Sequence, residues 1–165
     1  MKKNSIAFIL LIVSIFVFQS CSSDDDAADA NPGAAFNNEI SIGGTIYTLD
    51  GTAVLQSYGT NDDGSFDRDI EIFSTDLFLE FDVNTNAASG VSSGTYTYSN
   101  ARQNSTFYSV EIQLRENNLP TDILFTVQQQ GSVNISNEGN TTTITFNLMT
   151  QDGTEILGQW SGVIQ

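Results

Sequence analysis

The chain contains no histidine, and after Lys3 it contains no lysine. Without histidine, Ser-His-Asp and Cys-His catalytic arrangements and histidine-ligated zinc sites are excluded. Without lysine in the body of the chain, a Walker-type phosphate loop is excluded as well, and no glycine-rich phosphate loop is present. The general acids and bases that remain near neutral pH are carboxylates, so any catalysis would depend on aspartate and glutamate.

Cysteine and proline are also scarce. The single cysteine, Cys21, excludes an intramolecular disulfide. The two prolines are Pro32 and Pro120, and no window of the sequence repeats its apolar residues with the period of a helix. A fold without disulfides and with little helix is therefore expected.

Basic residues are few compared with acidic ones. Once residues 1–20 are removed, three arginines face 20 acidic residues, which leaves a net charge of −17. Such a chain has little with which to neutralise phosphates, so nucleic acid is not an expected partner. The same charge keeps the protein soluble and away from anionic surfaces.

The N-terminus has the features of a secretory signal peptide, to which we assign residues 1–20. Lys2 and Lys3 provide a positive start, and an apolar run follows over residues 6–18. This run is shorter than the ~20 apolar residues of a membrane span, and no basic cluster follows it. A membrane-spanning helix is the less favoured alternative.

The segment Phe18-Gln19-Ser20-Cys21 resembles the lipobox of bacterial lipoproteins, with Phe18 standing where leucine is the commonest residue. The resemblance implies that Cys21 is lipidated and becomes the new N-terminus. A buried or free thiol is the alternative, but residues 19–35 provide no core to bury it. Because each buried methylene contributes ~0.8 kcal/mol, several acyl chains anchor a protein stably.

An acidic, polar stretch follows the cysteine, and it is typical of a disordered tether over residues 21–38. Asp24, Asp25 and Asp26 resemble the acidic export signal of Bacteroidota lipoproteins that reach the cell surface. The resemblance implies an outer-membrane, surface-exposed protein, anchored by its N-terminal lipid. A solvated linker whose charge is incidental is the alternative.

Residues 39–165 are expected to form a single all-β domain. Short runs of β-branched and aromatic residues alternate with turn signals, such as Gly43-Gly44 between two strands. The alternation places Ile70 and Ile72 on one face of a strand, opposite Asp67, Asp69 and Glu71. Other inward-facing sets are Leu77, Leu79, Phe81 and Val83; Tyr108, Val110, Ile112 and Leu114; and Ile144, Phe146 and Leu148.

The spacing of these runs predicts an antiparallel β-sandwich of nine or ten strands, and a small lipocalin-like barrel is the alternative. Residues 115–122 are expected to be a loop, and residues 123–136 one long strand bent or bulged at Gly131. The closing segment, residues 131–165, resembles the C-terminal hairpins of small uncharacterised Bacteroidota lipoproteins. That resemblance implies an all-β fold and a lipoprotein's location in the cell, and it implies no activity.

One loop has a composition that suits calcium, because Ca²⁺ takes several oxygen ligands. Asn61, Asp63 and Asp67 are the candidate ligands. The spacing does not match an EF-hand, and Asx-rich turns usually have only a structural role, so a plain hairpin loop is favoured. No catalytic residue, metal or other cofactor is assigned.

Two functions remain open from the sequence, and a purely structural envelope protein is a third that the sequence does not separate from the first. The favoured one is a non-catalytic binding or accessory module for a glycan or a partner lipoprotein, with exposed aromatic rings as platforms. The candidate rings are Tyr58, Phe78, Tyr96, Tyr98, Phe107 and Trp160, of which Trp160 is expected in the core. The alternative is a carboxylate-dependent glycan hydrolase using acids among Asp69, Glu71, Glu80 and Glu111. The hydrolase is less favoured, because acids on the polar faces of strands are expected to be solvated and ionised.

Overall fold

The computed structural model describes residues 36–165, and within them it contains eleven β-strands and no helix. No helix that could span a membrane occurs in that range. The strands are β1 (Glu39–Ile42), β2 (Thr45–Thr48), β3 (Thr52–Thr60), β4 (Phe66–Phe73), β5 (Leu77–Thr85), β6 (Gly94–Tyr98), β7 (Thr106–Glu116), β8 (Leu119–Val127), β9 (Gln130–Glu138), β10 (Thr141–Met149) and β11 (Glu155–Gly162).

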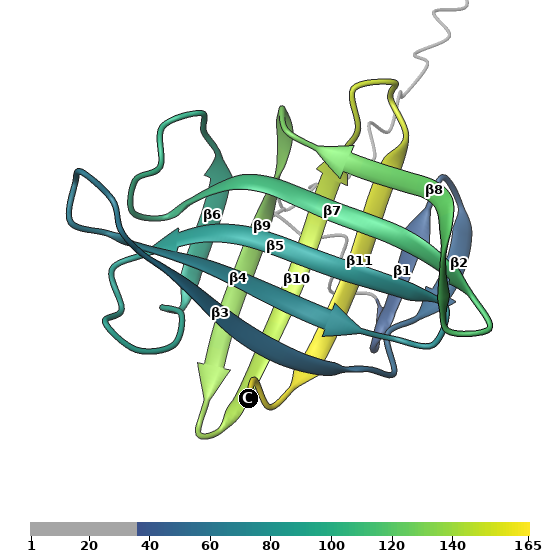
Figure 1. The fold of residues 1–165 in the computed structure, drawn as a ribbon, viewed down its shortest axis with the longest axis horizontal. Helices are drawn as coiled ribbons and strands as arrows, with labels where there is room; N and C mark the ends of the chain where they lie inside the picture. Colours follow the sequence, from purple (N-terminus) through teal and green to yellow (C-terminus); the bar gives the residue numbers. More distant parts are fainter. Residues whose placement is uncertain (1–35) are drawn as a thin grey trace, which may run out of the picture.

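The strands form one curled sheet that folds into two layers (Figure 1). Its order is β2-β1-β11-β10-β9-β6-β7-β5-β4-β3, with β8 attached to β7. The layer of β3, β4, β5, β7 and β8 crosses steeply over the layer of β9, β10 and β11 (Figure 1). The sheet passes between layers at β6 and β7, which pair in parallel over a short stretch, whereas the other strand pairs are antiparallel. The all-β prediction is confirmed, and the sheet is mixed.

Among the described residues, the hydrophobic core lies between the two layers. Strand alternation explains it, because Ile70, Ile72 and the inward residues of β5 and β10 are fully or almost fully buried. The rings of Phe81 and Phe146 meet across the layers with centroids 5.3 Å apart. Trp160 is also buried, as expected, and its indole N–H donates to the Gly51 carbonyl at 3.2 Å.

The free edge of β3 is covered by the end of the chain. The Leu55 N–H donates to the Gln165 carbonyl at 3.1 Å, and the Gln165 N–H donates to the Ala53 carbonyl at 3.0 Å. The C-terminus therefore lies beside β3, close to the turn between β9 and β10 (Figure 1).

The predicted alternation fails at the start of β7. Phe107 is fully buried and Tyr108 is exposed, the reverse of the expectation. The cause is a β-bulge: Asp82 pairs with Ser109 and Val83 pairs with Phe107, so Tyr108 has no partner on β5. Beyond the bulge, Val110 and Ile112 point inward as predicted.

The structure has eleven strands among the described residues, more than the nine or ten expected, because the expected loop at residues 115–122 is a tight hairpin. Asn117 and Asn118 both adopt positive φ, 53° and 63°, as a two-residue type I′ turn requires. Strand β8 begins directly after them and includes Pro120, which an edge strand tolerates. The predicted long strand over residues 123–136 is therefore two strands, β8 and β9, with a break at residues 128–129.

Candidate functional site

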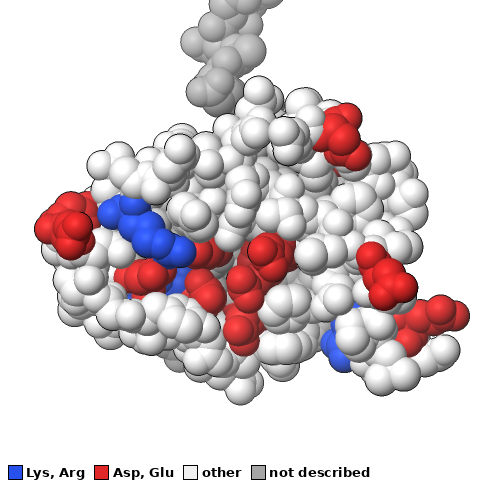
Figure 2. Space-filling model, turned by 45° about the horizontal axis from the view of Figure 1, so that its top comes forward, with Lys and Arg blue, Asp and Glu red and all other residues white. Residues whose placement is uncertain are grey.

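Acidic side chains gather on the outer face of the layer that contains β4, β5 and β7 (Figure 2). We call this surface the acidic face, and it consists of Asp67, Asp69, Glu71, Glu80, Asp82 and Glu111. Their neighbours in sequence point inward and form the core, so the pleat of each strand turns the carboxylates outward. The acidic face therefore results from the alternation of side chains in three neighbouring strands, β4, β5 and β7.

The strand register places like charges directly opposite one another. Asp69 pairs with Asp82, Glu71 pairs with Glu80, and Glu80 pairs with Glu111 on its other side. Like charges that face each other across a sheet are destabilising. A protein that keeps such an arrangement on one face is a candidate for ligand binding there, because perturbed groups cluster at functional sites.

Two of these carboxyl groups hold their protons unusually tightly. Partial burial, together with the charges of Asp82 and Asp67, raises the pKa of Asp69 to about 6. Partial burial, together with the charges of Asp69 and Glu111, raises the pKa of Glu80 to about 7. The expectation that the acids on the polar faces stay solvated and fully ionised is therefore wrong for Asp69 and Glu80.

The raised pKa values predict how stability depends on pH. Between about pH 4 and pH 7 the folded protein binds more protons at Asp69 and Glu80 than the unfolded chain, so the free energy of unfolding falls as pH rises. Both side chains are partly exposed, and we expect a loss of only ~1–2 kcal/mol from pH 5 to pH 8. Urea unfolding at the two pH values measures it. Glu80→Gln should reduce the difference, and a wild-type stability that is level or rises with pH would contradict the account.

Arg102, in the loop between β6 and β7, crosses over one end of the acidic face. Its guanidinium forms a bidentate pair with Asp82, at 2.7 and 2.6 Å, and also binds Asp67 at 2.6 Å. It lies over the ring of Tyr108 with 4.5 Å to the centroid, so the bulge at Tyr108 supplies a support for it. No sequence pattern predicted this role, because the loop is distant in sequence from both aspartates.

An open depression of about 280 Å³ lies where these groups meet, and Tyr58, Asp67, Asp69, Asp82 and Arg102 line it. The side chain of Tyr58 on β3 is 63% exposed. Tyr58 and Asp69 line the same depression, and the charge of Asp69 raises the pKa of the Tyr58 hydroxyl. The depression thus presents one aromatic ring, several carboxylates and one guanidinium to solvent.

A second hollow of about 600 Å³ adjoins the first through Arg102. It lies between the β3–β4 turn, at residues 60–63, and the β6–β7 loop, at residues 100–103. Asp63 connects the two loops, because its carboxylate accepts from the backbone N–H of Asn104 at 2.9 Å. The two hollows thus share Arg102, and the first of them lies on the acidic face.

The structure uses the three candidate calcium ligands for other contacts. The Asn61 amide donates to Ser65 Oγ at 3.0 Å and to Asn84 Oδ1 at 2.8 Å. Asp63 accepts from the Ser65 backbone N–H at 2.9 Å, and Asp67 pairs with Arg102. These contacts hold the loop in its hairpin shape, and the calcium site stays a hypothesis.

The carboxylates that do converge are Asp67, Asp69 and Asp82, whose oxygens lie within 4.8 Å of one another. Sequence reasoning placed Asp67 and Asp69 on one polar strand face and Asp82 on another, and it could not pair them. The Arg102 guanidinium already supplies positive charge to two of the three.

The other aromatic candidates have different surroundings. Tyr96, Phe107 and Trp160 are buried, and Tyr98 packs against the core, so none of them offers an open platform. Phe78 is half-buried and packs against Phe73. Cys21 and the aspartates 24–26 lie outside the described residues, so the lipid anchor and the export signal stay predictions.

Comparisons of the chain with protein-family models, with curated proteins and with solved structures found no match.

Proposed function

We propose that the protein is a lipid-anchored binding protein of the bacterial outer membrane that holds a glycan on its acidic face without cleaving it. The N-terminal resemblance to lipoproteins, through Cys21 and the aspartates after it, supports the anchor and the surface location. The observation that carries the binding proposal is the depression lined by Tyr58, Asp69, Asp82 and Arg102.

The chemistry of this depression suits hydroxyl-rich ligands. A carboxylate accepts hydrogen bonds from sugar hydroxyls, and a guanidinium donates to ring and hydroxyl oxygens. An exposed tyrosine ring offers an apolar platform with a polar tip. Because the surface is strongly acidic, neutral glycans or glycans with amino sugars are favoured over acidic ones.

Two adjoining hollows favour an oligosaccharide over a single sugar as the ligand. The depression at Tyr58 and the hollow between the two loops share Arg102, so a chain of several sugars could contact both. Ordered contacts on such an open site depend on a rigid support, and strands β4 and β5 provide it.

A carboxylate-dependent glycan hydrolase is the second candidate. One observation favours it: with a pKa raised to about 7, Glu80 is partly protonated at neutral pH, as a general acid must be. A hydrolase also needs a second, ionised carboxylate at a defined separation. Asp67 and Asp82 are engaged with Arg102, which makes them less available for that role.

The glycan proposal predicts a specific loss of affinity. A panel of neutral and amino-sugar oligosaccharides is titrated into the chain that begins at residue 22, which contains every described residue. Tyr58→Ala should weaken the binding of the best oligosaccharide about three- to tenfold, the loss of one aromatic contact. Ile46→Ala, an exposed apolar side chain on β2, is the matched control and should leave the affinity unchanged.

Mass spectra of the oligosaccharide after incubation separate the two functions. Intact oligosaccharide supports the binding module, and shortened products that disappear in Glu80→Gln would establish the hydrolase instead. The proposal is wrong if no oligosaccharide binds, or if Tyr58→Ala binds as tightly as wild type.

A further inference from the structure

Arg68 is a buried cation on the inner side of the sheet. Its side chain has the same orientation as Ile70 and Ile72 on β4, which are fully buried, and Arg68 is itself only 5% exposed. Its neighbours Asp67 and Asp69 point to the other face. The guanidinium is therefore separated by the sheet from the carboxylates of the acidic face.

The contacts of this guanidinium are incomplete. Nη1 donates to Ser57 Oγ, Nη2 donates to the Ala88 carbonyl at 3.1 Å, and the group lies 5.2 Å from the centroid of the Phe66 ring. Nε is buried and has no hydrogen-bond partner. Among residues 36–165 the ion pairs found involve Arg102, and none involves Arg68.

A buried cation without a counter-ion is costly to fold, and so is a buried donor without an acceptor. The chain has 20 acidic residues from which a partner could have come. An unsatisfied buried group of this kind requires an explanation, such as a ligand that supplies the missing acceptor.

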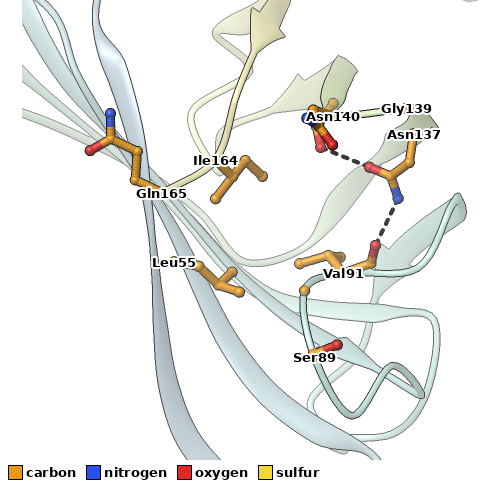
Figure 3. A pocket seen from close by; sticks show the side chains of 10 residues that line it. Leu55, Ser89, Val91, Asn137, Gly139, Asn140, Ile164 and Gln165 are labelled. Carbon is orange, nitrogen blue, oxygen red and sulfur yellow. Dashed lines mark hydrogen bonds between the residues drawn. The ribbon is translucent and has the colours of Figure 1, made fainter.

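A hollow of about 400 Å³ lies at one end of the two layers (Figure 3), and its lining includes Ser89, the residue after Ala88. Leu55, Val91 and Ile164 provide its apolar lining, and Asn137 and Asn140 lie at its rim (Figure 3). No aspartate or glutamate side chain is among the described residues that line it. In a strongly acidic protein this is a region where an anion meets little repulsion from side chains.

Two connections join Arg68 to the hollow. On β3, Leu55 pairs with Ile70 and Ser57 pairs with Arg68, so the lining residue and the hydrogen-bond partner lie along one strand. On the other side, the Ala88 carbonyl that accepts from Arg68 directly precedes Ser89, which lines the hollow. The segment 86–91 thus separates the guanidinium from the open space.

We propose that this hollow binds an amphipathic carboxylate, a short apolar chain that ends in one carboxyl group. The apolar chain contacts Leu55, Val91 and Ile164. The carboxylate replaces the Ala88 carbonyl as the acceptor from Nη2 and also accepts from Nε, which forms the bidentate pair that arginine favours. Segment 86–91 shifts to admit it. The site is independent of the acidic face and of any glycan bound there.

Octanoate is the probe, titrated by calorimetry and by thermal unfolding into the chain that begins at residue 22. Octanoate should bind and raise the melting temperature, because a ligand that binds the folded state stabilises it. Octanol lacks the charge and acetate lacks the apolar chain, so each should bind at least tenfold more weakly.

Arg68→Met keeps the volume and removes the charge. It should bind octanoate at least tenfold more weakly than wild type, and it should melt no lower in the absence of octanoate, because an unpaired buried charge has been removed. Asn140→Asp places a negative charge at the rim without touching the core and should weaken octanoate binding severalfold. Asn118→Asp makes the same change at the distant β7–β8 turn and should have no effect.

The site is disproved if octanoate does not bind, or if octanol or acetate binds as well as octanoate. It is also disproved if Arg68→Met or Asn140→Asp binds octanoate like wild type. A lowered melting temperature of Arg68→Met, combined with no effect of octanoate on wild type, would show that Arg68 only fastens segment 86–91.

Discussion

Replacing Cys21 with serine is expected to move the protein from the membrane fraction to the soluble fraction almost completely. The lipoprotein resemblance implies that Cys21 carries several acyl chains, and serine lacks the thiol that would be acylated. One chain gives only marginal binding at ~0.8 kcal/mol per buried methylene, and two or more anchor stably. The described part of the chain offers no spanning helix as a substitute.

The measurement is fractionation of cells together with metabolic labelling by palmitate. Ser22→Ala, a change at the adjacent position, is the control and should remain labelled and membrane-bound. A Cys21→Ser variant that still requires detergent for its extraction would contradict lipid anchoring and would favour a membrane-spanning N-terminus.

Arg102→Ala is expected to have the largest effect on stability of any change at the acidic face. Side chains of Asp82 and Asp67 are 11% and 18% exposed, so removing the guanidinium leaves two largely buried charges without a partner. Breaking a buried pair costs 3–5 kcal/mol, and partial exposure of Arg102 reduces this to ~2 kcal/mol at pH 8.

The loss should depend on pH. Burial already raises the pKa of Asp82, and removing Arg102, which lowers it, raises it further. The loss should therefore be smaller at pH 5, where the carboxyl group of Asp82 takes up a proton more readily. Arg102→Lys should recover part of the stability, since lysine keeps the charge and loses the bidentate geometry.

Arg115→Ala is the matched control. Arg115 donates to the backbone carbonyls of Ser74 and Asn118, and its removal leaves no carboxylate unpaired. Its effect on stability should be the same at pH 5 and at pH 8. Unfolding by urea at both pH values distinguishes the variants, and an Arg102→Ala protein as stable as wild type at pH 8 would show that the ion pairs contribute nothing.

Strand alternation and glycine turns are local signals, and they predicted much of the fold. The hairpin at Gly43-Gly44 and the inward faces of β4, β5 and β10 are as expected. The Asn117-Asn118 turn was missed because Pro120 favours a loop, whereas an edge strand accepts it. The bulge at Tyr108 was missed because it depends on pairing with β5.

The site was less predictable, because its properties depend on register. Alternation alone puts Asp69, Glu80 and Glu111 on polar faces, but only the pairing of β4, β5 and β7 brings them together and raises two pKa values. Arg102 reaches the face from a loop, which no periodicity describes. Arg68 was predictable as an inward residue, since it alternates with Asp67 and Asp69, but its missing partner is visible only in three dimensions.

The central claim is that the acidic face binds a glycan and leaves it intact. Nuclear magnetic resonance spectra of the isotope-labelled chain, recorded while the best oligosaccharide of the panel is added, test both parts at once. The account predicts shifted amide signals around Tyr58, Asp69, Asp82 and Arg102, together with unchanged oligosaccharide signals. Shifts confined to other surfaces, or new reducing-end signals that grow with time, would contradict it.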